Sequence, residues 1–508
     1  MKAIFKLFIL NLLALALLPS CSDDDQSNSE QNDPVSGNIS PVGSFFVEAT
    51  NNENELLVKW TNPSNRDVDM VELSYRDVET SLSRATDFSP GHIIIQVERD
   101  VTQEYLLKVP YFATYEVSAV AISKAGKRSV PESRIMMPYH EKVDEPELKL
   151  PEMLDRAHSY MTSVIGYYFG KSSRSCWRGN YPYDGKGYWD GDALVWGQGG
   201  GLSAFVAMRD ATKESEVENI YGAMDDMMFK GIQYFCQLDH GILAYSCYPA
   251  AGNERFYDDN VWLGIDFTDT YQMTQEQKYL DKAQLIWKFI ESGTDSILGG
   301  GIYWCEQKKE SKNTCSNAPG SVLALKLFKA TNDSSYFEKG KKLYEWTQRN
   351  LQDSADYLYF DNIRLDGKIG KAKFAYNSGQ MMQSAALLYQ LTRNPLYLKD
   401  AQNIAKECYN YFFTDFTTTT GESFKMLKQG DIWFTAVMLR GFIELYQIDK
   451  DKTYINAFNK SLSYAWDNAR DEKGLFKTDL TGNNKDQKKW LLTQAAMVEM
   501  YSRLAMIQ

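Results

Sequence analysis

The sequence predicts a mainly α-helical protein, an (α/α)6 toroid of six helical hairpins preceded by a small all-β sandwich. The helical part is indicated by a helix–turn–helix pattern that recurs within residues 141–508 at intervals of about 60 residues. The repeat is marked by Tyr279, Tyr336, Tyr397 and Tyr454. The β part is indicated by residues 41–140, where short apolar segments alternate with polar residues at a period of two.

Composition limits the functions that the chain can serve. It has 508 residues, of which 44% are hydrophobic, and a formal net charge of -12 without a Lys/Arg-rich block. We therefore exclude nucleic acid as a partner and expect a neutral substrate. Four histidines without an HExxH motif, and cysteines without metal-ligand spacing, predict no metal and no cofactor. Acid–base chemistry would then fall to carboxylates.

The N-terminal residues have the pattern of an export signal. Residues 1–20 combine a basic start with an apolar stretch too short to span a bilayer. Residues 18–21 (LPSC) resemble a bacterial lipobox, which predicts cleavage before Cys21 and acylation of that cysteine. We expect a monomer held by a lipid anchor in an outer membrane, exposed at the cell surface or, alternatively, facing the periplasm.

Residues 21–40 form a polar, acidic segment that predicts a disordered linker. Asp23, Asp24 and Asp25 resemble the export tag of surface lipoproteins in Bacteroides-like bacteria. The alternative is an acidic solvated tether. The other six cysteines either form one or two disulfides or are buried as small apolar residues.

Residues 41–140 are predicted to form the antiparallel sandwich. Five strand-like segments, at 56–60, 71–75, 92–97, 105–109 and 115–123, are separated by Asn-, Pro- and Gly-containing turns. Trp60 and the segment that begins at Tyr115 resemble a fibronectin type III module, which implies a core tryptophan and a corner tyrosine. We expect this module to space or position the domain that follows.

Residues 141–508 contain four clear hairpins and a degenerate fifth at 193–235. One helix at 152–169 and one at 488–507 remain without partners. If the two ends of the chain pair, these helices supply the sixth hairpin and close a ring. An open solenoid of the same repeats is the alternative.

Polar and aromatic residues gather before the first helix of each hairpin. In a closed ring the inner helices run parallel, so these segments would meet at one rim. Asp and Asn there could also cap helices, each cap contributing about 1 kcal/mol. Aromatic faces and polar edges together suit a sugar ring. The predicted substrate-binding residues are Trp189, Asp192, Tyr257, Asn260, Trp262, Trp304, Asn317, Tyr376, Asn377 and Asp431.

Asp258 and Asp259 stand apart because they are adjacent. A helix cap explains one of the two carboxylates and leaves the other without a role. Glycoside hydrolysis needs two carboxyl groups, one that protonates the leaving oxygen and one that attacks the anomeric carbon or activates water. We therefore predict that this pair is catalytic.

Three segments resemble glycoside hydrolase family 76, the endo-acting α-1,6-mannanases. They begin YDDNVWLGIDFTDTY at 257, GGGIYWC at 299 and AYNSGQMM at 375. The resemblance implies a retaining enzyme in which Asp258 is the nucleophile and Asp259 the general acid/base, with α-mannan as substrate. Ser378 and Trp433 depart from the family pattern as we expect it, so subsite preferences stay open.

Two further interpretations compete with this one. A different (α/α)6 sugar enzyme, such as an exo-α-mannosidase or a lyase, would use the same fold. A lyase would need basic residues to neutralise a uronate, and the predicted rim holds few. A non-catalytic glycan-binding lipoprotein would share the anchor and the aromatic residues but lack activity.

Overall fold

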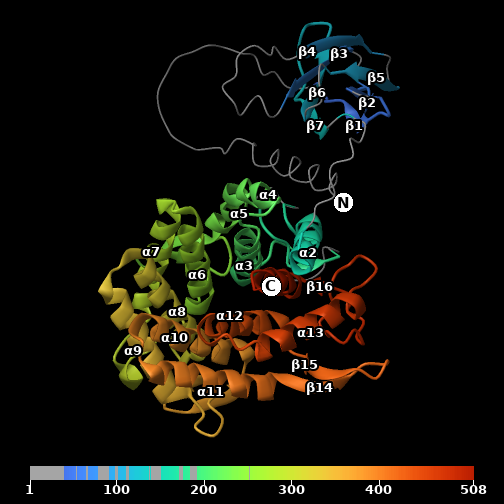
Figure 1. Ribbon diagram of the computed structural model, residues 1–508. Coiled ribbons are helices and arrows are strands. Elements are labelled where there is room, and N and C mark those ends of the chain that lie inside the picture. The colour runs from blue at the N-terminus through green and yellow to red at the C-terminus, as the bar shows by residue number, and fades with distance from the viewer. Residues whose placement is uncertain are drawn as a thin grey trace. The chain divides into compact units, whose positions relative to one another are not determined.

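The computed structural model describes residues 39–52, 54–64, 67–77, 91–97, 101–109, 114–136, 138, 150–170, 175–182, 191–250 and 252–507. The predicted signal, Cys21 and nearly all of the predicted linker lie outside these residues. The chain divides into two compact units, residues 1–147 and 148–508 (Figure 1). Each unit is described here by itself.

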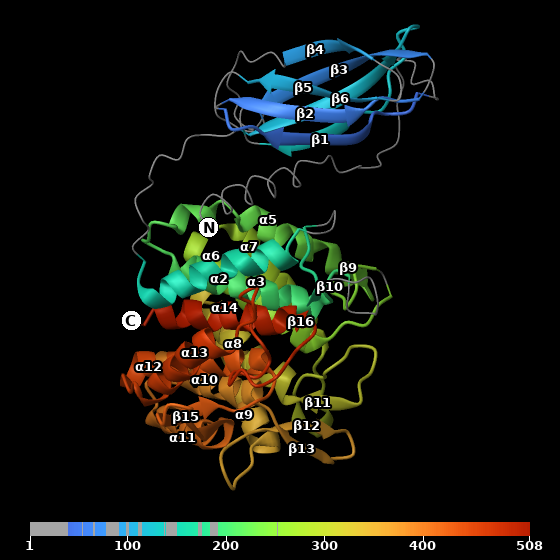
Figure 2. The ribbon, with the colours of Figure 1, turned by 90° about the vertical axis from the view of Figure 1, so that its right-hand side faces the viewer.

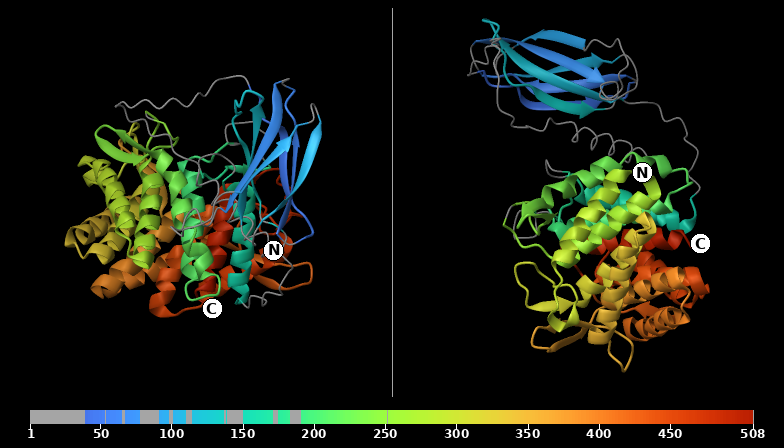
Figure 3. Two further views of the ribbon diagram at one scale, coloured as in Figure 1. Left: turned by 90° about the horizontal axis from the view of Figure 1, so that it is seen from above. Right: turned by 90° about the vertical axis from the view of Figure 1, so that its left-hand side faces the viewer.

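The first unit contains two antiparallel sheets that share one apolar core (Figures 2 and 3). One sheet has the order β1-β2-β5 and the other β4-β3-β6-β7. The strands are β1 (Gly43–Ala49), β2 (Glu55–Thr61), β3 (Val68–Asp77), β4 (Gly91–Gln96), β5 (Thr102–Lys108), β6 (Tyr115–Ser123) and β7 (Glu132–Met136). Trp60 and Tyr115 are fully buried in this core. A β domain is therefore present, while its membership in the fibronectin type III family stays a prediction.

The second unit is helical and has two layers. The inner helices are α3 (Val195–Ala211), α6 (Tyr257–Thr274), α8 (Thr314–Thr331), α10 (Ala375–Thr392), α12 (Ile432–Asp449) and α14 (Leu491–Ala505). The outer helices are α2 (Glu152–Tyr168), α7 (Gln277–Ser292), α9 (Ser334–Leu351), α11 (Pro395–Phe412) and α13 (Thr453–Asn468). The outer element after α3 is irregular, with α4 (Glu218–Gly222), α5 (Asp225–Lys230) and the 3-10 turn η1 (Gly231–Phe235).

The inner helices close into a ring. Each contacts the next in the order α3, α6, α8, α10, α12 and α14, and α14 returns to contact α3. Helix α2 packs on α14, so the two ends of the unit form the sixth pair (Figures 1 and 2). The (α/α)6 toroid preceded by a β domain is confirmed, and the open solenoid is wrong because the terminal helices bury their apolar surfaces against one another.

Burial separates the two layers. Helix α10 is buried almost all round over its first fourteen residues, whereas α11 is buried along one stripe only. A helix that is buried on nearly all sides fits the centre of a ring, and an amphipathic helix fits its outside. None of the helices in the described part of the chain has the length and hydropathy that a bilayer crossing requires.

Short strands connect each outer helix to the next inner helix at one end of the ring. They pair as β9 (Cys236–Asp239) with β10 (Ile242–Tyr245), β11 (Ser311–Asn313) with β12 (Phe360–Arg364) and β13 (Ile369–Lys373), β14 (Phe413–Thr417) with β15 (Ser423–Leu427), and β8 (Asn180–Tyr181) with β16 (Lys489–Trp490). The six described cysteines are all free thiols. Sequence analysis left open one or two disulfides, and the structure has none among these six cysteines.

Helices α10 and α12 approach so closely that only glycine fits. A Cβ atom on Gly379 would lie 2.4 Å from the Met438 Cα atom, and one on Gly441 would lie 2.3 Å from the Gly379 carbonyl oxygen. Gly166 in α2 offers a contrast, since no atom lies within 4 Å of its added Cβ.

Gly379→Ala should therefore destabilise the protein by about 1–3 kcal/mol, because the added methyl group forces the two inner helices apart. The matched substitution Gly166→Ala should stabilise it by up to about 1 kcal/mol, because alanine loses less backbone entropy in a helix. Urea unfolding followed by circular dichroism measures both. Equal effects of the two substitutions would contradict the close crossing.

Candidate active site

The loops at the rim are held by amide side chains from the inner helices. Asn260 accepts a hydrogen bond from the Tyr245 backbone N–H at 2.7 Å and donates to the Tyr245 carbonyl at 2.8 Å. Asn317 forms the same pair of bonds with Ile302, at 2.7 and 2.9 Å. Both asparagines are fully buried. Their amides are bonded to the backbone of the preceding segment and do not line the cavity, so their contact with substrate stays a prediction.

The same arrangement recurs around the ring, and we call it the amide clamp. In each case the side chain of the fourth residue of an inner helix binds the backbone of one residue in the segment before that helix. Gln198 in α3 binds both backbone groups of Trp177, at 2.9 and 2.8 Å. Gln494 in α14 binds both of Phe476, at 2.9 and 3.0 Å. In α10 the fourth residue is Ser378, whose hydroxyl accepts one bond from Tyr359 N–H at 3.1 Å. Ser378, which departs from the expected family pattern, thus stands at the fourth position of its helix and binds the loop through a shorter side chain.

The start of α6 is tied to both neighbouring loops by Arg255. Its guanidinium is buried, pairs with both carboxylate oxygens of Glu306 at 2.6 Å and donates to the carbonyls of Asp239 and Ile242. The residue after Arg255 is Phe256, and the centroid of its ring lies 4.9 Å from that of the Trp304 ring. Sequence analysis missed Arg255, although an arginine three residues before an acidic pair is a signal that could have been weighed.

Trp304 connects its loop directly to the acidic pair. Its carbonyl accepts a bond from Tyr257 N–H at 2.9 Å, and its indole N–H donates to Asp258 Oδ2 at 3.1 Å. The Trp304 side chain is 40% exposed, unlike most tryptophans of this unit. Tyr257 itself is buried and stacks on Phe289 with 4.5 Å between ring centroids. Tyr257 does not line the cavity next to the acidic pair, so its contact with substrate stays a prediction.

A cavity of about 310 Å³ opens at this rim. Five of the predicted residues line it together: Asp258, Asp259, Trp262, Trp304 and Tyr376. The remaining walls come from Leu194, Trp196, Cys247, Phe256, Trp433 and Phe434. Apart from the two aspartates, no Asp, Glu, Lys, Arg or His among the described residues lines it. The cavity is thus an aromatic enclosure with two adjacent carboxyl groups in its wall.

The aromatic wall is tightly packed opposite the carboxyl groups. Tyr376 and Phe434 stack at 4.0 Å with an interplanar angle of 8°. Trp433 meets Trp262 edge to face at 5.3 Å, and Trp196 meets Trp433 at 5.6 Å. Because these rings come from α3, α6, α10 and α12, only ring closure brings them together. Sequence analysis had noted aromatic residues at the rim but did not select Trp196, Trp433 or Phe434 as site residues.

The two carboxyl groups lie in different surroundings. Burial raises the pKa of Asp258 to about 6, an effect opposed by hydrogen bonds from the Cys315 thiol and the Trp304 indole. Burial and then the charge of Asp258 raise the pKa of Asp259 well above its usual range. Among the described residues, no side-chain donor opposes the shift of the Asp259 pKa. The pair therefore titrates in two steps, and Asp258 is the group that ionises first.

Asp192, Asn377 and Asp431 do not line the cavity. Asp431 accepts a bond from Trp433 N–H at 2.9 Å, so it is the N-cap of α12. Asp192 forms an isolated β-bridge with Arg178 and does not line the cavity. Asn377 is fully buried beside Asp361 and does not line the cavity, so its contact with substrate stays a prediction. Trp189 lies outside the described residues.

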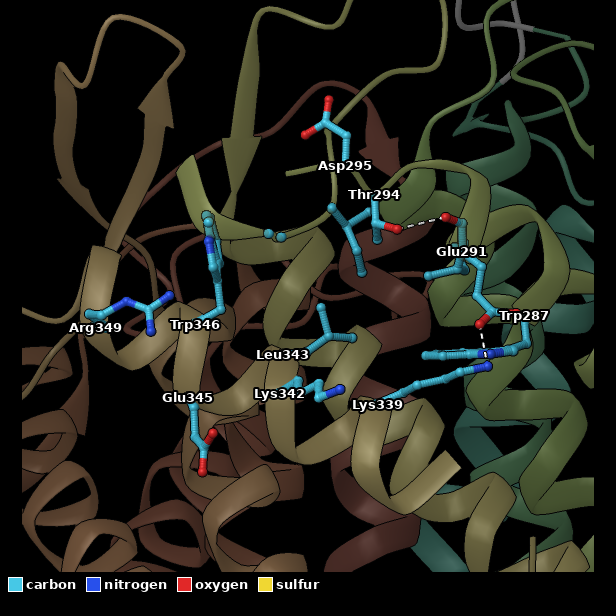
Figure 4. A pocket seen from close by; sticks show the side chains of 15 residues that line it. Trp287, Glu291, Thr294, Asp295, Lys339, Lys342, Leu343, Glu345, Trp346 and Arg349 are labelled. Carbon is cyan, nitrogen blue, oxygen red and sulfur yellow. Dashed lines mark hydrogen bonds and ion pairs between the residues drawn. The ribbon is translucent and has the colours of Figure 1, made fainter. Parts of the chain in front are cut away.

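A second cavity, of about 360 Å³, lies between α7 and α9 and shares no lining residue with the first (Figure 4). Trp287 and Trp346 contribute to its walls, and Lys339 pairs with Glu291 across it. Asp295, also at this cavity, pairs with the buried Lys312 at 2.7 Å, and its pKa is lowered. Acids held ionised in this way are poor proton donors, so the cavity with Asp258 and Asp259 is the candidate active site.

The comparisons with known proteins agree with this fold. The model of the glycosyl hydrolase family 76 matches residues 152–422, more than half of the chain. A family 76 mannosidase from Bacteroides thetaiotaomicron is 54% identical, with a TM-score of 0.69 over 70% of this chain and 99% of its own. A family 76 glycoside hydrolase from a bovine strain of that species is 40% identical, with a TM-score of 0.68 over 92% of this chain and 100% of its own.

Curated relatives are more distant and match in part. The mannan endo-1,6-alpha-mannosidase DCW1 of Saccharomyces cerevisiae is 27% identical over 157 residues, which span 28% of this chain and 35% of the yeast protein. This chain therefore matches about a third of that relative's length. The ring of hairpins, the acidic pair in its cavity and the match over residues 152–422 lead to one conclusion: the chain belongs to glycoside hydrolase family 76.

Proposed function

We propose that the protein is an endo-acting hydrolase of α-1,6-mannosidic bonds in the backbone of α-mannan. The observation that carries the proposal is the pair of adjacent carboxyl groups with unequal surroundings in one aromatic cavity. Two similar proteins support the substrate: the structure that is 54% identical is named a mannosidase, and the yeast relative a mannan endo-1,6-alpha-mannosidase. A neutral hexose fits a cavity whose walls are aromatic.

We assign the nucleophile to Asp258 and the acid/base role to Asp259. Asp258 receives neutral donors that favour its ionised form, as a nucleophile requires. Asp259 keeps its proton through burial and the neighbouring charge, as a general acid requires. After attack by Asp258 on the anomeric carbon, Asp259 would deprotonate the water that hydrolyses the mannosyl–enzyme ester.

The competing activities fit the cavity less well. A polysaccharide lyase needs cationic groups near a uronate, and the cavity wall has no Lys, Arg or His among the described residues. An exo-acting α-mannosidase would share the acidic pair, so product length has to separate it from an endo enzyme. A non-catalytic glycan-binding protein would have no reason to hold two adjacent acids at raised pKa values.

The deciding experiment incubates the purified protein with unbranched α-1,6-mannan and follows product length over time. Endo action gives a mixture of short oligosaccharides early in the reaction. Asp258→Asn and Asp259→Asn should each lower turnover by at least about a thousandfold, because each removes a group that reacts in one of the two steps. Both variants should still retard on a mannan-containing affinity gel.

Asp415→Asn, an exposed substitution in β14, is the matched control and should retain full activity. Release of mannose alone from the first time point would overturn endo action. Wild-type turnover by either active-site variant would overturn the assignment of the pair.

The raised pKa of Asp258 also predicts a dependence of stability on pH. A carboxyl whose pKa is about 6 in the folded state and about 3.9 in the unfolded state favours folding at low pH, and this contribution is lost as the pH rises through 6. Asp258→Asn should therefore be more stable than the wild type at pH 7.5, by about 1–2 kcal/mol. At pH 4 the gain should vanish. Urea unfolding at both pH values measures it, and a gain that is independent of pH would contradict the buried charge.

We propose further that Cys21 carries the lipid that holds the protein in the outer membrane. Cys21→Ala should move the protein from the membrane fraction to the soluble fraction of the periplasm, because one thiol carries the anchor. Replacing Asp23, Asp24 and Asp25 by Asn should leave it in the membrane but protect it from protease added outside the cells. Membrane association of Cys21→Ala equal to that of the wild type would refute the anchor.

A further inference from the structure

The Trp304 side chain presents two parts to different groups. The N–H edge of its indole donates to Asp258 Oδ2 at 3.1 Å, a distance typical of an N–H···O hydrogen bond. The residue is also 40% exposed and lines the cavity beside the acidic pair, whereas Trp262 and Trp433 in the same wall are buried. Trp304 therefore combines a direct contact with the carboxyl that we assign as nucleophile and a ring that a ligand can reach.

Backbone hydrogen bonds fix this ring from both sides. The Trp304 N–H donates to the Ser311 carbonyl at 3.2 Å, and the Trp304 carbonyl accepts from Tyr257 N–H at 2.9 Å. Since Tyr257 is the residue before Asp258, the second bond ties the tryptophan to the helix start that carries the nucleophile. The Phe256 ring packs on the indole with 4.9 Å between ring centroids. The distance between indole and carboxyl is thus set before a substrate binds.

The segment that leads to Trp304 is held by a buried lysine. Lys312 is 0% exposed, and its Nζ donates to Asp295 Oδ1 at 2.7 Å and to the carbonyls of Ile297 and Gly300 at 2.9 and 2.6 Å. The Tyr303 hydroxyl donates to the other oxygen of Asp295 at 2.7 Å. These bonds close residues 295–303 into a fixed loop. Trp304 follows this loop directly, so its position does not depend on a flexible segment.

Asp258 has a neutral donor although a cation lies three residues before it in the sequence. The Arg255 guanidinium is bound to both carboxylate oxygens of Glu306 and to loop carbonyls. A cationic donor would bind the Asp258 carboxylate more strongly and lower its basicity. The indole N–H orients the carboxylate with less loss of nucleophilicity.

We infer that Trp304 is a catalytic residue, whose N–H edge holds the Asp258 carboxylate for attack and whose exposed face stacks on the sugar that is attacked. The inference rests on the proposed role of Asp258. Sugar rings bind aromatic faces through their apolar C–H groups. Because edge and face belong to one rigid ring, a sugar stacked on Trp304 lies at a fixed distance from the nucleophile.

The titratable groups that face the two carboxyls are acids. They are Asp259 itself on α6, Cys247 after β10, Cys315 on α8 and Tyr376 on α10, with Asp361 on β12 near Tyr376. Burial raises the pKa of both thiols and of the tyrosine, which keeps these three groups uncharged at neutral pH. Loss of the indole donor therefore leaves Asp258 with less support for its ionised form, and its pKa rises further.

The test compares Trp304→Phe, Trp304→Ala and the matched control Trp346→Phe. The Trp346 indole donates to the Leu298 carbonyl at 2.9 Å, in the same loop, but Trp346 does not line the active cavity. With a short α-1,6-mannooligosaccharide, Trp304→Phe should lower kcat about tenfold and leave KM within about twofold, because it removes the donor and keeps a ring. The acidic limb of its kcat/KM profile should move up by about one pH unit.

Trp304→Ala should in addition raise KM by about tenfold, because it removes the stacking face. Trp346→Phe should unfold at a lower urea concentration but keep the wild-type pH profile. Equal pH profiles of Trp304→Phe and the wild type would overturn the inference. Equal shifts in Trp304→Phe and Trp346→Phe would also overturn it, because they would indicate loop stability as the cause. An unchanged KM in Trp304→Ala would refute the stacking role.

Fluorine NMR of protein labelled with fluorotryptophan reads the contact without turnover. The signal that is missing in Trp304→Phe belongs to Trp304. It should shift with pH near 6, where Asp258 titrates, and the shift should be lost in Asp258→Asn. A Trp304 signal that does not respond to pH would contradict the contact. If the wild-type protein cleaves no α-mannan, the proposed function fails, and this signal alone decides whether the indole holds Asp258.

Discussion

The site depends on one interaction, the bond between an amide in the first turn of an inner helix and the backbone of the loop that precedes it. Asn260 and Asn317 each bind both the N–H and the carbonyl of one residue in the segment that precedes their helix. Buried backbone groups must be paired, and an unpaired one costs about 1–3 kcal/mol. The amide clamp therefore fixes each of these loops relative to the inner helices, and the rim acquires a defined shape.

The position of the acidic pair follows from these clamps. Asn260 is the residue after Asp259, so the same turn of α6 holds the loop and presents the carboxyl groups. The neighbouring clamp at Asn317 holds Ile302, two residues before the indole that donates to Asp258. Burial raises the pKa of both aspartates, while the donors on one side favour ionisation of Asp258. Two identical side chains thus acquire different protonation behaviour from different neighbours.

Much of the architecture could be predicted because it follows from the local periodicity of apolar residues in the sequence. The recurring tyrosines marked hairpins of constant size, and the unpaired helices at 152–169 and 488–507 indicated ring closure, which α2 and α14 confirm. The acidic pair could be singled out because adjacent like charges have no simple structural purpose. The backbone bonds of Asn260 and Asn317 could not be predicted for a physical reason: an asparagine that binds backbone and one that binds a sugar look the same in the sequence.

By itself, the sequence determined the two domain types, the number of hairpins and the residues that a carboxylate-based hydrolysis would need. These follow from patterns of apolar residues and from the chemistry of single side chains. Only the tertiary structure decided which residues share the cavity, since Trp196, Tyr376 and Phe434 come from separate hairpins. It also decided that Asn260 and Asn317 bind the backbone, and that the Trp304 indole donates to Asp258. Such contacts depend on the closure of the ring, which no local stretch of sequence contains.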